Sequence, residues 1–75
     1  MDIIIRVDGV EYHYDNPIKA YTDIASRYNI PVKATQSILH YVTSHKYEHV
    51  VIEYSQANGR VFLTGLHVDG IHKYT

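Results

Sequence analysis

Two helical patterns with only a short turn between them constrain this chain more than any other feature. Apolar residues recur at positions i, i+3, i+4 and i+7 in two successive segments: Tyr21, Ile24, Ala25 and Tyr28, then Thr35, Ile38, Leu39 and Val42. This spacing places the apolar side chains on one face of each helix. We therefore expect helices over about residues 17–28 and 32–45.

The residues between the two patterns favour a sharp turn. Asn29 can enter the left-handed region at low cost and so end the first helix. Pro31 suits the first turn of the second helix, because its missing N–H would have no partner there. Ile30 is expected to fill the angle between the helices, and the small Ala25 to lie where they cross closely. Two crossed helices are therefore predicted.

Over residues 24–39 this pattern resembles the helix-turn-helix family of DNA-binding domains. The matching residues are those at the start, on both sides of the turn and in the second helix: Ile24-Ala25, Tyr28, Ile30 and Ile38-Leu39. Asn29 stands where the family usually has Gly, and Thr35 where it usually has Val or Ile. An ordinary pair of helices that covers a sheet is the alternative interpretation.

The resemblance implies a set of base-facing residues on the second helix: Val32, Lys33, Gln36, Ser37 and His40. Gln can pair with adenine through two hydrogen bonds, and Ser can bond to either base type. Backbone contacts with DNA are expected from four cations and one amide: Lys19, Arg27, Lys46, Arg60 and Asn58.

The charge distribution is uneven, although the formal net charge is only -1. Between Pro17 and Lys46 four basic residues stand against the single Asp23, and the rest of the chain is acidic. The predicted helices are thus the basic part, as DNA binding requires, but the field is weak. An ordinary mixed surface would also explain it.

The residues from Ile3 to Tyr14 predict a hairpin around the favoured turn Asp8-Gly9. Six apolar residues then share one face in three opposed pairs: Val7–Val10, Ile5–Tyr12 and Ile3–Tyr14. The other face holds two pairs, of which the first has opposite charges: Arg6–Glu11 and Ile4–His13. After the hairpin, Asn16-Pro17 predicts a helix cap.

A second hairpin is expected between His49 and Leu66, around Asn58-Gly59. A two-residue loop would mix apolar and polar residues on both faces, so we predict a four-residue loop over residues 56–59. That register has two apolar pairs and three outward residues: Tyr54–Val61 and Ile52–Leu63, with Glu53, Arg60 and Thr64 outside.

The last turn, Val68-Asp69-Gly70-Ile71, echoes Val7-Asp8-Gly9-Val10 and predicts a short final strand. The fold class is therefore α+β in one domain: an N-terminal hairpin, a helix-turn-helix unit and a C-terminal hairpin. This order resembles winged-helix and excisionase-like proteins, in which the hairpin tip contacts DNA. The tip here would comprise Gln56, Asn58, Gly59 and Arg60. A simple solvent-exposed turn is the alternative.

Six histidines raise the question of a metal site. His45 and His49 are four residues apart, but a strand that starts near Glu48 would separate them. His67 and His72 would face each other across the last turn without an obvious third ligand. We therefore expect scattered surface histidines and neither a metal nor another cofactor.

The chain has eight tyrosines, and most of them take core-facing positions in these patterns. Tyr41 and Tyr47 do not, and they mark a candidate protein-partner surface at the far end of the second helix. Packing of these two rings against the sheet is the alternative.

Composition narrows the function further. The 75 residues suffice for one small domain, and without cysteine it has no disulfide or Cys-based zinc site. The chain has no phosphate-binding loop, no nucleophile motif, no apolar stretch long enough to cross a bilayer and no basic start of a signal peptide. We expect an intracellular protein without enzymatic activity.

The leading hypothesis is a small DNA-binding protein that reads the major groove with its second helix. Such a protein would regulate transcription or recombination, in the manner of phage or viral regulators, and would bind duplex DNA as a homodimer. The alternative is a protein-binding module that modulates a host enzyme or polymerase without touching DNA. The weak charge, the two unassigned tyrosines and the acidic strands favour that alternative.

Overall fold

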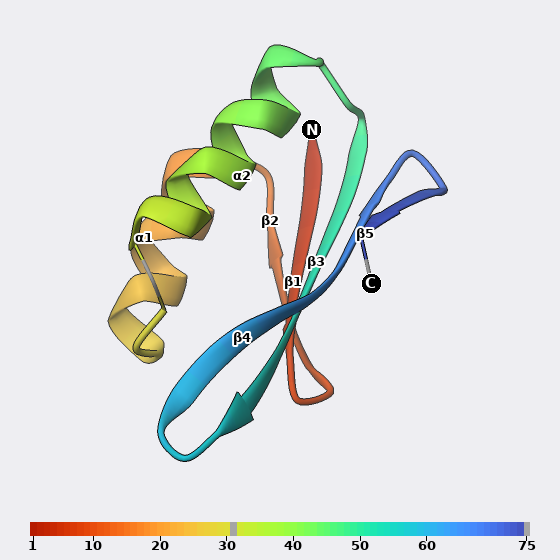
Figure 1. Cartoon of the computed structure of the whole chain (residues 1–75). Coiled ribbons are helices and arrows are strands. Elements are labelled where there is room, and N and C mark those ends of the chain that lie inside the picture. The colour runs from red at the N-terminus through yellow and green to blue at the C-terminus, as the bar shows by residue number, and fades with distance from the viewer. Residues whose placement is uncertain (31, 75) are drawn as a thin grey trace.

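The computed structural model describes residues 1–30 and 32–74 and has an α+β architecture (Figure 1). Its elements follow in the order β1 (Asp2–Val7), β2 (Val10–Tyr14), α1 (Pro17–Arg27), α2 (Val32–Ser44), β3 (His49–Ala57), β4 (Arg60–Val68) and β5 (Ile71–Tyr74). Pro31 and Thr75 lie outside the described residues, as do the side chains of Val32 and of residues 72–74.

All five strands form one sheet with the order β2-β1-β3-β4-β5. The β1–β3 pairing is parallel and every other pairing is antiparallel. The chain leaves β2, forms both helices and returns as β3 on the other side of β1. The two predicted hairpins therefore belong to one mixed sheet, joined at its centre by two strands that lie far apart in the sequence.

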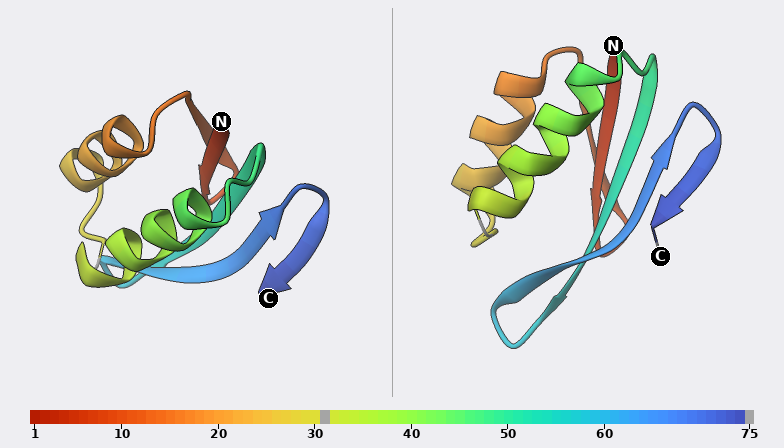
Figure 2. Two further views of the ribbon diagram at one scale, coloured as in Figure 1. Left: turned by 90° about the horizontal axis from the view of Figure 1, so that it is seen from above. Right: turned by 45° about the horizontal axis from the view of Figure 1, so that its top comes forward.

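Both helices lie on the same side of the sheet and run in roughly opposite directions (Figures 1 and 2). The core between the two layers includes residues from both helices and from β1, β3 and β4: Ala20, Ile24, Leu39, Val42, Ile3, Ile5, Val50, Ile52 and Val68. The Thr35 hydroxyl is also buried, and it lies 3.4 Å from the hydroxyl of Tyr54. No helix in the described part of the chain is long and apolar enough to cross a membrane.

The register predicted for the first hairpin is confirmed in all five pairs, from Val7–Val10 to Ile3–Tyr14. A two-residue turn at Asp8 and Gly9, both with positive φ, fixes this register. Val10 is nevertheless 53% exposed, whereas its partner Val7 is buried; Val10 lies on the edge strand of the sheet and Val7 on its neighbour.

The start of α1 is as predicted, whereas its end is not. The Asn16 side chain accepts hydrogen bonds from the backbone N–H groups of Ile18 and Lys19, with Pro17 in the first turn. Helix α1 ends through an extended Tyr28, and Asn29 is not among the residues with positive φ.

The predicted left-handed Asn29 is therefore wrong. The N–H of Ile30 donates to the carbonyl of Tyr28 at 3.0 Å, which makes Asn29 the centre of a tight three-residue turn. Ile30 is buried as expected. Ala25 is exposed, and the small residue buried in α1 is Ala20, which lies at the core-facing position one turn before Ile24.

The four-residue loop predicted for the second hairpin is also wrong. The loop is the two-residue turn Asn58-Gly59, with Ala57 paired to Arg60. The faces are realigned by a β-bulge at Glu53/Tyr54, where Tyr54 pairs with Leu63 but Glu53 pairs with Gly65. The extra residue, Thr64, shifts the alternation by one position. Leu66 and Val68 thereby face the core with Ile52 and Val50.

The predicted turn at Val68–Ile71 and the short final strand are confirmed. The two echoing turns hold opposite ends of β3. Asp8 Oδ1 accepts a hydrogen bond from Gln56 N at 3.1 Å, and Asp69 Oδ1 accepts from Glu48 N at 3.0 Å and His49 N at 2.8 Å. Each aspartate thus fastens the central strand to a neighbouring turn.

Candidate nucleic-acid interface

Helix α2 presents a polar face away from the sheet. Thr35, Leu39 and Val42 are buried beneath it. Four exposed side chains with the spacing i, i+3, i+4 and i+7 form the opposite face, which we call the α2 strip: Lys33, Gln36, Ser37 and His40. They line one shallow hollow. The four predicted base-facing side chains that the structure describes therefore share one exposed surface.

The helix that carries the α2 strip has no acidic residue. The sequence contains no Asp or Glu between Asp23 and Glu48, so α2 and the turn before it carry no negative side chain. The first acidic residue after the helix is Glu48, directly before β3. Lys33 lies in the first turn of α2, and Lys46 follows its end with a φ of 55°. A polyanion that approached α2 would meet no like charge on the helix itself.

The tip of the β3–β4 hairpin lies beside the turn between the helices. One hollow is lined by residues of both: Asn29, Ile30, Arg60, Val61 and Phe62. In Figure 1 the hairpin extends past the helical layer at the lower left, the end at which α1 finishes. Asn58 and Arg60, two predicted backbone contacts, are exposed on this tip.

The other predicted backbone contacts are less uniform. Arg27 lies 3.0 Å from Asp23, one helical turn earlier, and its guanidinium carbon is 5.0 Å from the centre of the Tyr12 ring. The carboxylate raises the pKa of Arg27 and offsets its charge. Lys19 and Lys46 are exposed at the start of α1 and just after α2. The predicted cations therefore do not form one continuous basic patch.

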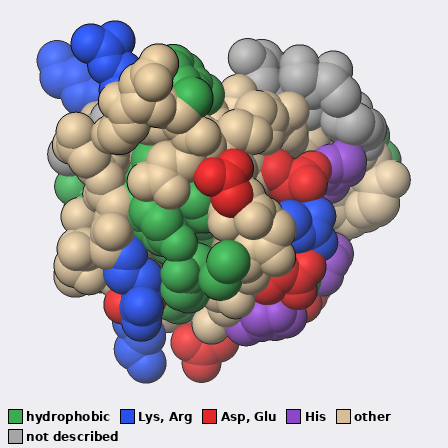
Figure 3. Space-filling view, turned by 90° about the horizontal axis from the view of Figure 1, so that it is seen from below, with side chains coloured by type: hydrophobic (Ala, Val, Ile, Leu, Met, Phe, Trp, Pro, Cys, Tyr) green, Lys and Arg blue, Asp and Glu red, His purple; other side chains and the backbone are tan. Residues whose placement is uncertain are grey.

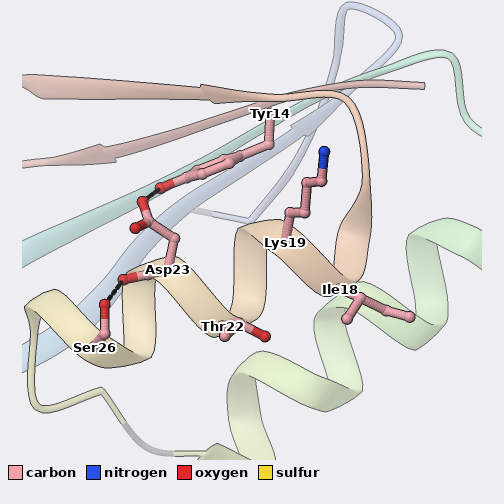
Figure 4. Close-up of a pocket in the computed structure, with 6 residues that line it drawn as sticks. All are labelled: Tyr14, Ile18, Lys19, Thr22, Asp23 and Ser26. Atoms are coloured by element: carbon pink, nitrogen blue, oxygen red, sulfur yellow. Dashed lines mark hydrogen bonds between the residues drawn. The ribbon is translucent and has the colours of Figure 1, made fainter.

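A third hollow lies on the outer side of α1, next to β2 (Figure 4). The Tyr14 hydroxyl donates to the Asp23 carboxylate, and the Ser26 hydroxyl donates to the Asp23 carbonyl at 2.7 Å. The Tyr14 contact, and after it Arg27, lowers the pKa of Asp23, while burial and this hydrogen bond raise the pKa of Tyr14. Tyr14, Asp23 and Ser26 are therefore paired with one another in this hollow, and Lys19 also lines it.

Tyr41 and Tyr47 are brought together at the end of α2. Their hydroxyl oxygens are 3.3 Å apart, and the His45 ring lies parallel to the Tyr47 ring with centroids separated by 5.6 Å. Both tyrosines are half-buried against the core, whereas His45 is exposed. The rings therefore combine packing with a partly accessible aromatic surface.

The face of the sheet opposite the helices holds a row of charges. Arg6 donates to Glu11 on one side and to Glu53 on the other, at 3.0 and 2.8 Å, and Glu53 is 2.8 Å from His67. The contacts with His67 and Arg6 lower the pKa of Glu53. Figure 3 shows acidic and histidine side chains around a basic one on this part of the surface. We call His67, Glu53, Arg6 and Glu11 the charge row.

Sequence reasoning found the Arg6–Glu11 pair but missed the rest of the charge row. Glu53 reaches Arg6 only because β3 pairs in parallel with β1, and no local pattern announces that pairing. Gly65 was the one clue in the sequence to a close contact with Glu53. In the structure, a Cβ at position 65 would lie 2.8 Å from Glu53 Oε1. A glycine inside a strand often marks such a close approach.

Across residues 1–30 and 32–74, no group of three His, Cys, Asp or Glu side chains is placed to hold a metal ion. His45 follows α2, whereas His49 begins β3 and lies 2.8 Å from Asp2. His67 and His72 are register partners as expected, and the side chain of His72 lies outside the described part.

Comparison with protein-family models, with curated proteins and with solved structures finds no match to this chain.

Proposed function

We propose that this protein binds duplex DNA as a small regulator of transcription or recombination, with the α2 strip directed into the major groove. The observation that carries the proposal is the α2 strip itself: four exposed polar side chains in one stripe on a helix without acidic residues. A major groove admits one α-helix, and Lys, Gln and Ser are side chains that bond to base edges there.

The neighbouring hairpin tip supports the same orientation. Arg60 and Asn58 are exposed next to the turn that precedes α2, so they are available to the sugar-phosphate backbone when α2 approaches a groove. Arg27 has a smaller role than the sequence resemblance implied, because Asp23 holds it. With a formal net charge of -1, non-specific affinity should be low and base contacts correspondingly important.

The test is binding to a duplex enriched from a random-sequence pool, measured by fluorescence anisotropy at about 50 and 200 mM salt. Arg60→Ala, which removes a predicted backbone contact, should reduce the slope of log K against log salt by about one. Lys33→Ala, which removes a predicted base contact, should reduce the preference for the enriched duplex. Gln36→Ala should leave that slope unchanged and reduce the preference for the enriched duplex over a scrambled one by about tenfold, the effect of 1–3 kcal/mol per base contact.

A matched control removes one positive charge and one polar side chain from the sheet, through Lys73→Ala combined with Ser55→Ala on β5 and β3. Its binding should equal that of the wild-type protein. Undetectable binding at low salt would contradict the proposal, as would equal losses in the control and in Lys33→Ala combined with Gln36→Ala.

A second candidate function is recognition of a host protein, such as an enzyme or polymerase, without DNA. The paired rings of Tyr41 and Tyr47 beside the exposed His45 favour it, because aromatic side chains are common anchors of protein interfaces. In that case one partner would be captured by the wild-type protein and by Gln36→Ala, and lost with Tyr41→Ala combined with Tyr47→Ala.

A further inference from the structure

Strand β2 forms one edge of the sheet, and its outward backbone groups can be identified from the register. Val7 and Val10 flank a two-residue turn and therefore exchange hydrogen bonds. Bonded and non-bonded pairs alternate in an antiparallel ladder, so the N–H and C=O groups of Glu11 and His13 point away from β1. The even-numbered residues of β1 accordingly bond away from β2, as the hydrogen bond from Asp2 N to Glu48 O at 2.8 Å, directly before β3, shows.

The charge row ends at this edge. Across β4, β3, β1 and β2 the row runs from His67 to Glu53, Arg6 and Glu11. Each neighbour is in hydrogen-bond contact with the next, and the charges alternate in sign from Glu53 to Arg6 to Glu11. The last member is a carboxylate on the edge strand β2. A further strand would continue the alternation if it placed a cationic side chain opposite Glu11.

We propose that two copies of this chain associate through β2, in antiparallel pairing about a two-fold axis at Tyr12. In this register Glu11 of each copy faces His13 of the other. Both residues have outward backbone groups, so each of the two symmetry-related pairs exchanges two backbone hydrogen bonds. The contact is self-complementary, as a closed two-fold dimer requires.

The pairing of a carboxylate with an imidazole selects this register over its neighbours. An axis at Glu11 would place two carboxylates opposite each other, and an axis at His13 would do the same with two imidazoles. The axis at Tyr12 instead places the His13 side chain of the second copy next to Glu11, so that the charge row continues across the interface. Within its own chain His13 already lies 3.2 Å from Glu11, so both groups belong to one polar surface.

The first experiment is oxidative cross-linking, for which the absence of cysteine in the chain is an advantage. Tyr12→Cys should form a disulfide-linked dimer, because residues at the axis are a non-hydrogen-bonded pair with Cα atoms about 4.5 Å apart. Val10→Cys is the control, since its two copies would be about 14 Å apart along the strands. Cross-linking of Val10→Cys that equals or exceeds that of Tyr12→Cys would overturn the proposed register.

A second experiment does not depend on Tyr12, whose hydroxyl contacts Tyr28 at 2.6 Å and whose loss perturbs the fold. Sedimentation equilibrium should show a dimer for the wild-type protein and at least tenfold weaker association for His13→Glu. Ser55→Glu, which adds the same charge on β3, on the face of the sheet that carries the charge row, should leave association unchanged. Amide exchange at Glu11 and His13 should slow as protein concentration rises.

A monomer at every concentration would overturn the proposal, as would a dimer that His13→Glu leaves intact. The proposal does not rest on DNA binding. A dimer without DNA affinity, or DNA affinity in a monomer, would therefore separate the two conclusions.

Discussion

The two aspartates that fasten β3 should contribute unequally to stability, in proportion to the hydrogen bonds each accepts. Asp69 accepts two backbone hydrogen bonds and Asp8 accepts one. Replacing each by Gly preserves the positive φ, 49° at Asp69 and 47° at Asp8, and removes only the side chain. Both variants create the same Gly-Gly turn, so the added flexibility of the unfolded chain is nearly equal in the two.

At about 1 kcal/mol per hydrogen bond, Asp69→Gly should lose about 2 kcal/mol through these contacts and Asp8→Gly about 1 kcal/mol. The difference of about 1 kcal/mol corresponds to about 4–8 °C in melting temperature for a domain of this size. Asp69→Asn should remain close to the wild type, because Asn tolerates positive φ and keeps an Oδ1 acceptor.

Urea unfolding followed by circular dichroism measures these free energies, provided that the slope with denaturant stays constant across the variants. Equal losses in the two glycine variants would refute the hydrogen-bond count. A loss in Asp69→Asn as large as in Asp69→Gly would refute the role of the Oδ1 acceptor.

Substitutions at three further positions, Gly65, Glu53 and Asn16, test other contacts in the fold. Gly65→Ala should cost about 1 kcal/mol in urea unfolding, because its Cβ would come within 2.8 Å of Glu53 Oε1. The same change made together with Glu53→Ala should cost less than the sum of the two single losses. The pKa of Glu53 is lowered in the folded state, so its ion pairs stabilise the fold above the unfolded value of about 4.5 and are lost as pH falls through the lower folded value. Melting curves should therefore show that the gap between wild type and Glu53→Gln narrows in acid; a constant gap would contradict this. Asn16→Ala should cost about 1 kcal/mol in the same unfolding assay, whereas Asn16→Asp should not, and equal losses would argue against the cap.

Features set by neighbouring residues could be predicted from the sequence. The Asp8-Gly9 turn fixes the first hairpin, and Asn16-Pro17 fixes the start of α1. Apolar spacing also identified the buried and exposed faces of α2, and with them the α2 strip. In each case the determining contacts lie within a few residues of each other.

The second hairpin could not be predicted in the same way. Its hydrophobic pattern changes phase at Thr64, and a longer loop explains that change in the sequence as well as a bulge does. Only the packing of Leu66 and Val68 against the helices distinguishes the two. The extended end of α1 at Tyr28 likewise depends on how Ile30 enters the core.

Contacts between distant segments limited prediction of the candidate site. The resemblance assigned Arg27 to phosphate, but the residue one helical turn earlier, Asp23, holds its guanidinium. The charge row depends on the parallel pairing of Arg6 with Glu53, which are 47 residues apart. Local spacing therefore predicted which side chains are exposed on α2, and not which cations elsewhere are available to a ligand.

The central position of β3 has a consequence for the order in which the chain assembles. During synthesis β1, β2 and both helices emerge before β3. Until β3 is made, β1 is paired with β2 only, and its backbone groups on the β3 side have no strand partner. The β3–β4 hairpin can form locally, whereas its docking beside β1 must close a long loop, which slows folding. A ribosome-bound chain that ends before residue 49 should therefore expose apolar surface of β1 and bind chaperones. That surface should become buried, and the chaperones should dissociate, once β3 has been synthesised and pairs with β1.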